Sequence, residues 1–212
     1  MLTAPLPAAP EAAASQLIDV LAIDAQPLTV RRRPRLAIHG RRLNVLYGHV
    51  ATVSGTLRPR LARVQVVLDG LFGRRWIPVA HATTGARGRF QLRYAPRRTG
   101  SWDVQVHVRG DAWLQSATAR IGRLVSYQPA IASWYGGGGE TACGSYLTSA
   151  TMGVANRTLP CGTPVTLRYD GRTVTVDVID RGPYVEGREF DLTEATKRAL
   201  DFEGVGEVWA TR

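Results

Sequence analysis

The sequence predicts an all-β protein. The chain has 22 Gly and 12 Pro, which favour turns between short elements. Many short stretches alternate apolar and polar residues, as strands with one buried face do. No run approaches the roughly 18 apolar residues that a membrane-spanning helix needs. With 212 residues, of which 44% are hydrophobic, the chain is long enough for two domains.

The N-terminal part divides into a tail and a predicted β-sandwich. Residues 1–26 are rich in Ala and Pro and predict a mostly disordered tail, without a clear signal sequence. Residues 27–126 predict about seven short strands with turns every 8–12 residues, among them turns at Ser54-Gly55 and Asp69-Gly70. This pattern is typical of an immunoglobulin-like β-sandwich. The predicted strands are residues 43–46, 51–53, 63–68, 76–80, 90–94, 101–108 and 119–125.

Charge is concentrated in the predicted sandwich. Residues 27–131 carry 19 basic and 3 acidic side chains, whereas residues 132–212 carry 8 basic and 11 acidic ones. A basic surface attracts polyanions, including anionic wall polymers. Composition bias is an equal explanation, since all but one of the 27 basic residues are Arg. The four histidines, all in this segment, have no ligand spacing, so we predict no metal site.

The C-terminal part predicts a second β domain after a short linker at residues 127–131, which contain Pro129. Residues 164–169 and 172–178 predict a hairpin across Asp170-Gly171. The sequence Asp-Leu-Thr-Glu at 191–194 predicts a capping box, which opens a helix to about Leu200. Residues 208–210 predict a closing strand. The glycines at 136–139 are not a phosphate-binding loop, because no Lys-Ser/Thr pair follows them.

Five segments of this second domain, in order, resemble a known family. They are Ala132-Ser133-Trp134-Tyr135-Gly136, Thr141-Ala142-Cys143-Gly144, Asn156-Arg157-Thr158-Leu159-Pro160-Cys161-Gly162-Thr163, Val178-Ile179-Asp180-Arg181-Gly182-Pro183-Tyr184 and Gly187-Arg188-Glu189-Phe190-Asp191-Leu192. Together they resemble the rare-lipoprotein-A (RlpA-like) family, a relative of the expansins, over residues 131–209. The resemblance implies a six-stranded double-psi β-barrel with a short helix.

Asp180 and Asp191 are the candidate catalytic residues. Asp180 ends an alternating strand before a sharp Arg-Gly-Pro turn, and partial burial of a carboxyl there favours its protonated form. The resemblance implies a functional role for Asp180 and a place for Asp191 in the same groove. Two alternatives are structural, namely an ion pair of Asp180 with Arg181 or Arg188, and a helix N-cap at Asp191.

Further residues are candidates for glycan binding or for cross-linking. Aromatic rings at Trp134, Tyr135 and Tyr184 offer stacking surfaces for sugars, whereas Trp209 is predicted to lie in the core. The polar candidates are Ser145, Thr148, Asn156 and Arg181. Cys143 and Cys161 favour a disulfide, since this domain has no His to activate a thiolate and two Cys are too few for zinc.

The resemblance implies a secreted or cell-wall-associated protein that acts on peptidoglycan glycan strands as a monomer and without a cofactor. The first hypothesis is a lytic transglycosylase that forms 1,6-anhydromuramic ends. Lytic members of the family commonly carry Glu and His where this chain has Ser145 and Asn156, neither of which titrates near neutral pH. The alternatives are therefore a non-lytic, expansin-like binder and an adaptor that holds wall polymers. We expect no nucleic-acid binding, because no base-reading motif accompanies the charge.

Overall fold

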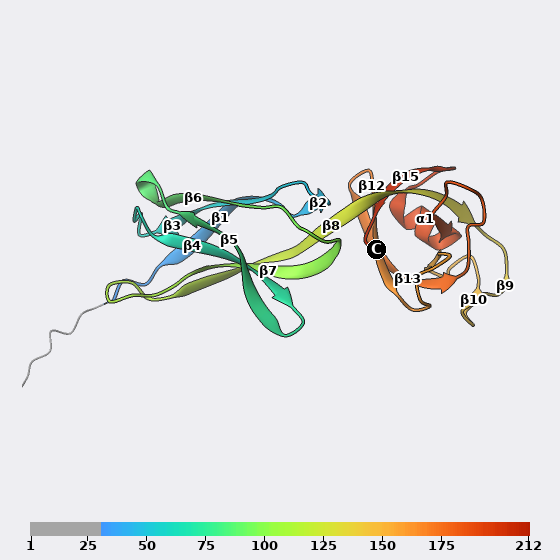
Figure 1. Ribbon diagram of the computed structural model, residues 1–212, viewed down its shortest axis with the longest axis horizontal. Helices are drawn as coiled ribbons and strands as arrows, with labels where there is room; N and C mark the ends of the chain where they lie inside the picture. Colours follow the sequence, from blue (N-terminus) through green and yellow to red (C-terminus); the bar gives the residue numbers. More distant parts are fainter. Residues whose placement is uncertain (1–30) are drawn as a thin grey trace, which may run out of the picture.

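The computed structural model describes residues 31–212, which form two β domains side by side (Figure 1). The predicted tail at residues 1–26 lies outside the described residues. Each domain has its own cluster of buried apolar side chains. In the described part of the chain, no helix is long and apolar enough to cross a membrane.

Two sheets form the N-terminal domain. One sheet has the order β1-β3-β6, from β1 (Arg35–Arg42), β3 (Ala51–Arg58) and β6 (Arg89–Tyr94). The other has the order β5-β4-β7-β8, from β4 (Gln65–Phe72), β5 (Arg75–Thr83), β7 (Gly100–Val108) and β8 (Ala117–Tyr135), with β2 (Asn44–Leu46) beside β8. Alternate side chains of both sheets, such as Val53, Leu92, Leu68 and Val106, enter one buried cluster. The domain is therefore a sandwich of two sheets.

The predicted turns at Ser54-Gly55 and Asp69-Gly70 were wrong, because these residues lie inside β3 and β4. Gly55 is needed within a strand: a Cβ there would lie 2.6 Å from the carbonyl oxygen of Ala37 and would overlap the Phe90 ring. At Asp69 the strand pairing shifts register, which marks a β-bulge. Glycine in these strands marks close packing rather than a reversal of the chain.

Strand β8 contains 19 residues and runs from the sandwich into the barrel (Figure 1). The predicted linker at residues 127–131 was therefore wrong. Residues 128–132 pair antiparallel with β15 (Gly206–Ala210), including Pro129 beside Trp209. Pro129 suggested a break in the chain, but a proline is tolerated where a strand does not need its N–H for pairing. A single strand thus belongs to the sheets of both domains.

The C-terminal domain is a closed barrel of six strands. The order is β14-β11-β13-β12-β15-β8, and β14 (Phe190–Thr193) also pairs with β8, which closes the ring. The remaining strands are β11 (Val154–Ala155), β12 (Pro164–Tyr169) and β13 (Arg172–Asp180). The predicted hairpin across Asp170-Gly171 and the closing strand are confirmed. A short ladder of β9 (Gly139–Glu140) and β10 (Tyr146–Leu147) lies outside the ring.

The one α-helix in the described residues, α1 (Glu194–Leu200), begins two residues later than a cap at Asp191 would require. Its N-cap is Thr193, whose hydroxyl accepts the N–H of Thr196 at 3.3 Å. The predicted N-cap at Asp191 was therefore wrong, because Asp191 lies in β14. This frees the Asp191 carboxylate for other contacts.

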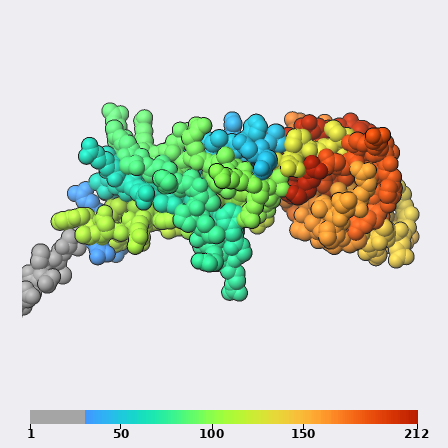
Figure 2. Space-filling model, in the orientation of Figure 1, coloured from blue at the N-terminus to red at the C-terminus, as the bar shows by residue number. Residues whose placement is uncertain are grey.

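The two domains touch directly where the sandwich meets β15 (Figure 2). Beside this junction the N–H of Tyr47 donates to the carbonyl of Tyr127 at 2.7 Å, which extends the β2–β8 pairing of the sandwich. At the C-terminus, Arg212 bonds Gln128 at 2.9 Å and contacts Glu189, and its carbonyl accepts from Thr99. The two domains are therefore linked by the shared strand and by the bond from Thr99 to the Arg212 carbonyl.

Candidate active site

A row of polar residues crosses four neighbouring strands of the barrel. Strand pairing places Asp180 of β13 beside Ala155 of β11, Ala155 beside Asp191 of β14, and Asp191 beside Ser133 of β8. Two strand spacings of 4.7–4.9 Å separate the two aspartates, which puts their Cα atoms roughly 10 Å apart. Ala155 is small and buried, so no large side chain stands between the aspartates.

Backbone donors hold one oxygen of Asp180. Its Oδ1 accepts the N–H of Ala142 at 2.9 Å and the N–H of Arg181 at 2.8 Å. The side chain is half-buried; among the described residues no group meets full hydrogen-bond geometry with Oδ2, although the Tyr135 hydroxyl lies close to the carboxyl. The carboxyl group is thus fixed by one oxygen, while the other is left for a substrate or a proton. The predicted ion pair of Asp180 with Arg181 or Arg188 does not form.

Asp191 is held by a side chain on the neighbouring strand. The hydroxyl of Ser133 donates to Asp191 Oδ1. Ser133 is buried and Asp191 is half-buried. The Ser133 hydroxyl therefore fixes the position of the Asp191 carboxyl group beside the strand that carries Tyr135.

Tyr135 lies close to both aspartates. Burial raises the pKa of its hydroxyl well above the ordinary value of 10.0, and the negative charges of Asp180 and Asp191 raise that pKa further. The hydroxyl is buried, and no described group meets full hydrogen-bond geometry with it, so its relation to Asp180 is close approach rather than a formed bond. Tyr135 therefore keeps its proton and is available as a donor.

Two of the predicted glycan-binding residues hold a loop. The Asn156 side chain is 8% exposed; its Oδ1 accepts the N–H groups of Thr158 at 3.0 Å and Leu159 at 2.8 Å. Its Nδ2 donates to the carbonyl of Glu189 at 3.0 Å. Arg181 donates to the carbonyls of Asn156 and Leu159 at 3.0 and 2.9 Å. All these bonds fix the backbone of residues 156–159.

The disulfide predicted between Cys143 and Cys161 is present, with Cα atoms 5.7 Å apart. It ties the loop at 156–162 to the turn at 141–145, and the Arg181 guanidinium approaches the Cys161 sulfur at 3.0 Å. The same turn donates the Ala142 N–H to Asp180. The cross-link therefore supports the group that positions the Asp180 carboxyl.

Two other predicted binding residues lie in turns around this site. Ser145 closes the turn at 141–145, where its carbonyl accepts from the Thr141 N–H at 2.8 Å and its N–H donates to the Thr141 hydroxyl at 3.1 Å. Ser145 therefore lies in the same turn as Ala142, whose N–H donates to Asp180. Thr148 is exposed and bonds Thr151 within a local turn.

The predicted aromatic residues do not form one platform. Tyr184 is 79% exposed on the loop that follows Asp180. Trp134 points to the opposite face of β8 from Tyr135, because side chains alternate along a strand, and the Lys197 ammonium lies 4.2 Å from its ring centroid. Trp209 was predicted to lie in the core, but it belongs to no buried cluster and lies at the domain junction.

Sequence reasoning missed Ser133 and the backbone N–H of Ala142. Ser133 is a polar residue between the apolar Ala132 and Trp134 of a strand, and that alternation was a usable signal. A backbone donor such as that of Ala142 carries no side-chain signal. Its role emerges only when the turn is placed over Asp180.

Known proteins match this barrel. Residues 128–209 match a family profile described as lytic transglycolase with a double-psi β-barrel. A protein of Aquifex aeolicus named probable endolytic peptidoglycan transglycosylase RlpA is 43% identical over 85 residues, which cover 38% of each chain. Proteins of the same name from Synechocystis and Nostoc are 40% and 41% identical; the matches cover 43% and 36% of this chain and 30% and 22% of theirs. This chain thus spans less than half of these relatives.

The closed ring of six strands, with the parallel pairs β11–β13 and β14–β8, is the architecture of a double-psi β-barrel. The family match and these relatives show that this barrel, over residues 128–209, is similar to those of RlpA-like proteins.

Proposed function

We propose that this protein is a lytic transglycosylase that cleaves peptidoglycan glycan strands and leaves 1,6-anhydromuramic ends. The observation that carries the proposal is the Asp180 carboxyl, which two backbone donors hold by Oδ1 while Oδ2 stays available. The names of the relatives, endolytic peptidoglycan transglycosylases, support the same reaction.

In this mechanism one carboxyl group acts twice. Protonated Asp180 gives its proton to the glycosidic oxygen as the bond from that oxygen to C1 breaks. The resulting carboxylate then takes the proton of the C6 hydroxyl, and O6 bonds to C1 of the same muramic acid. No water is consumed, and Asp180 ends protonated, ready for the next strand.

The neighbours of Asp180 have supporting roles in this proposal. Asp191, held by Ser133, is a negative charge that stabilises the positive charge developing on the sugar ring. Tyr135 keeps its proton, and its buried hydroxyl donates to the Asp180 carboxylate. We assign glycan contacts to Tyr184, Ser145 and Thr148, which border the site, whereas Asn156 and Arg181 position the loop that frames it.

One observation favours a second function, a non-lytic glycan binder. The Asn156 side chain is committed to the loop at 156–159, and Ser145 does not titrate, so the site has no second proton carrier at these two positions. A binder would use the same groove without cutting the strand. We place either protein at the cell wall, as a monomer, with the N-terminal sandwich as an immunoglobulin-like spacer that also attracts anionic wall polymers.

The test is a digest of purified peptidoglycan, read by mass spectrometry for 1,6-anhydromuramic ends. The parent protein should release them, and Asp180→Asn should not, although it still sediments with the sacculi. Tyr184→Ala removes only an exposed ring to which we assign a glycan contact. It is the matched control, because it should weaken sedimentation with the sacculi while the catalytic carboxyl is kept. If the parent protein sediments with the sacculi but releases no anhydro ends, the lytic proposal is wrong and the binder is favoured.

A further inference from the structure

The junction between the two domains contains a hollow of about 560 Å³. The sandwich contributes Arg42, Thr52 and Arg93 to its wall, and the barrel contributes Trp209. Its size lies within the roughly 300–1,000 Å³ range of ligand sites. The shared strand and the bond from Thr99 to the Arg212 carbonyl link its two sides.

Strand register arranges the basic groups of this hollow. Arg42 of β1 pairs with Thr52 of β3, and Thr52 pairs with Arg93 of β6. The neighbours of Thr52 in the strand, Ala51 and Val53, are buried, so Thr52 and both arginines lie on the outer face of the sheet. Within residues 31–212 neither arginine forms a salt bridge, and no acidic residue lines this hollow. Two free guanidinium groups are suited to a carboxylate or phosphate.

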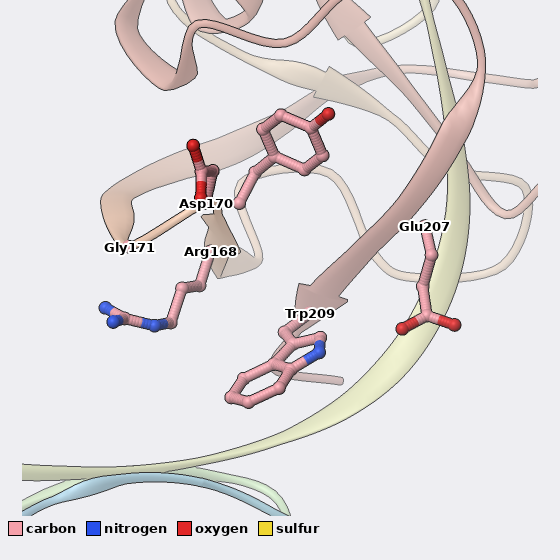
Figure 3. Close-up of a pocket in the computed structure, with 6 residues that line it drawn as sticks. Arg168, Asp170, Gly171, Glu207 and Trp209 are labelled. Atoms are coloured by element: carbon pink, nitrogen blue, oxygen red, sulfur yellow. The ribbon is translucent and has the colours of Figure 1, made fainter.

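Trp209 connects this hollow to a second one of about 480 Å³ on the barrel. Figure 3 shows the side chains of Arg168 and Trp209 projecting to the same side from neighbouring strands, with Asp170 and Glu207 around them. The ring of Tyr127 lies 5.9 Å from that of Trp209 and supports it from the buried side. An aromatic ring held in this way is a stacking surface for a sugar.

We propose that the junction binds an acidic saccharide, with a sugar ring on Trp209 and its carboxylate between Arg42 and Arg93. The carboxylates of Asp170 and Glu207 accept hydrogen bonds from sugar hydroxyls further along. These same carboxylates repel a dense polyanion, so the site discriminates against polyphosphate. This site lies apart from Asp180 and does not depend on cleavage by the barrel.

Binding to the full chain tests this site, in the Asp180→Asn background so that no glycan is cut. The probes are a peptide-free oligosaccharide of N-acetylglucosamine and N-acetylmuramic acid, a uronic-acid oligosaccharide, neutral chitotetraose and polyphosphate. NMR of the Trp209 indole N–H reports on this site alone, and calorimetry gives the affinity. At least one acidic saccharide should shift the Trp209 signal and bind at least tenfold more tightly than chitotetraose and polyphosphate.

Substitutions then identify the groups responsible. Arg42→Gln with Arg93→Gln should weaken that binding at least tenfold, whereas Arg74→Gln with Arg75→Gln, at the exposed β4–β5 turn, removes equal charge and should change it less than twofold. Trp209→Tyr keeps a ring and should retain more affinity than Trp209→Ala. The proposal is overturned if neither acidic saccharide shifts Trp209, if polyphosphate binds equally well, or if both arginine pairs act alike. Comparison of the affinities for the muramic-acid and uronic-acid oligosaccharides identifies which acidic sugar the site binds.

Discussion

The sandwich and the barrel each place an aspartate where a strand loses its regular pairing. In the sandwich, Asp69 is 3% exposed, and its Oδ2 bonds His107 Nδ1 at 2.5 Å and Gln105 Nε2 at 3.1 Å. In the barrel, Asp180 is half-buried and is held only through Oδ1, by backbone donors. The same residue type is thus closed off by side chains in one domain and left open to a ligand in the other. A carboxyl group is available for chemistry when the backbone, rather than other side chains, fixes it.

The largest expected effect is the difference in activity between a variant of Asp180 and a variant of Asp69. Asp180→Asn keeps an oxygen for both backbone donors, so its free energy of unfolding should stay within about 1 kcal/mol of the parent, while anhydro-product formation falls about 1,000-fold. Asp69→Ala leaves His107 and Gln105 without their partner and should cost about 2 kcal/mol without changing the rate at the barrel. Denaturant unfolding and digest assays measure both quantities. Equal losses of activity in the two variants would refute the comparison.

The next effect concerns the cross-link, which occurs in the barrel and not in the sandwich. Replacing both Cys143 and Cys161 by Ala should destabilise the barrel by about 3 kcal/mol, because the loop of 18 residues is no longer closed in the unfolded chain. The turn that donates the Ala142 N–H also loses its anchor, so activity should fall while the sandwich stays folded. Hydrogen exchange resolved by domain distinguishes this from general unfolding; equal deprotection of both domains would contradict it.

The third comparison is between one close-packed glycine in each domain, and the expected difference between the two variants is smaller, at about 2 kcal/mol. Gly55→Ala in β3 directs a methyl group at the carbonyl oxygen of Ala37, which cannot move without the strand. Gly153→Ala directs it at the side chain of Ile179, which has other rotamers. We expect about 3 kcal/mol of destabilisation for the first and about 1 kcal/mol for the second, by denaturant unfolding. Exposed Gly73→Ala controls for a glycine without close neighbours, although its positive φ adds strain there. The reverse order of the first two would refute the packing argument.

The smallest effect is a pH dependence. The pKa of Tyr135 is raised in the folded barrel, first by burial and then by the two aspartates, so its share of stability is complete below about pH 10 and is lost as pH rises further. Tyr135→Phe should therefore make the alkaline fall in stability shallower. The change should stay below about 1 kcal/mol, because Tyr135 is only half-buried. Urea unfolding at pH 8, 10 and 11 measures it, with the exposed Tyr146→Phe as a control that should leave the slope unchanged.

The sequence alone predicted features that depend on residues close together in the chain or on recognisable motifs. Asp170-Gly171 between two alternating stretches predicted the hairpin, the family motifs predicted the barrel, and two Cys in a domain without His predicted the disulfide. A linker was wrongly predicted because Pro129 indicates a break locally, whereas its pairing partner in the barrel, Trp209, lies 80 residues later. The roles of Asn156 and Arg181 were missed for a related reason. Their partners are backbone carbonyls and N–H groups, which no side-chain pattern reveals.

The 19-residue strand β8 has a practical consequence for anyone who wants to divide this protein. Truncation at residue 132, where the family motifs begin, would remove four of the five β8 residues that pair with β15 and leave an unpaired edge prone to aggregation. An isolated barrel should instead start at or before Gln128. Recombination with a different N-terminal module likewise requires a donor whose last strand continues in register across the boundary.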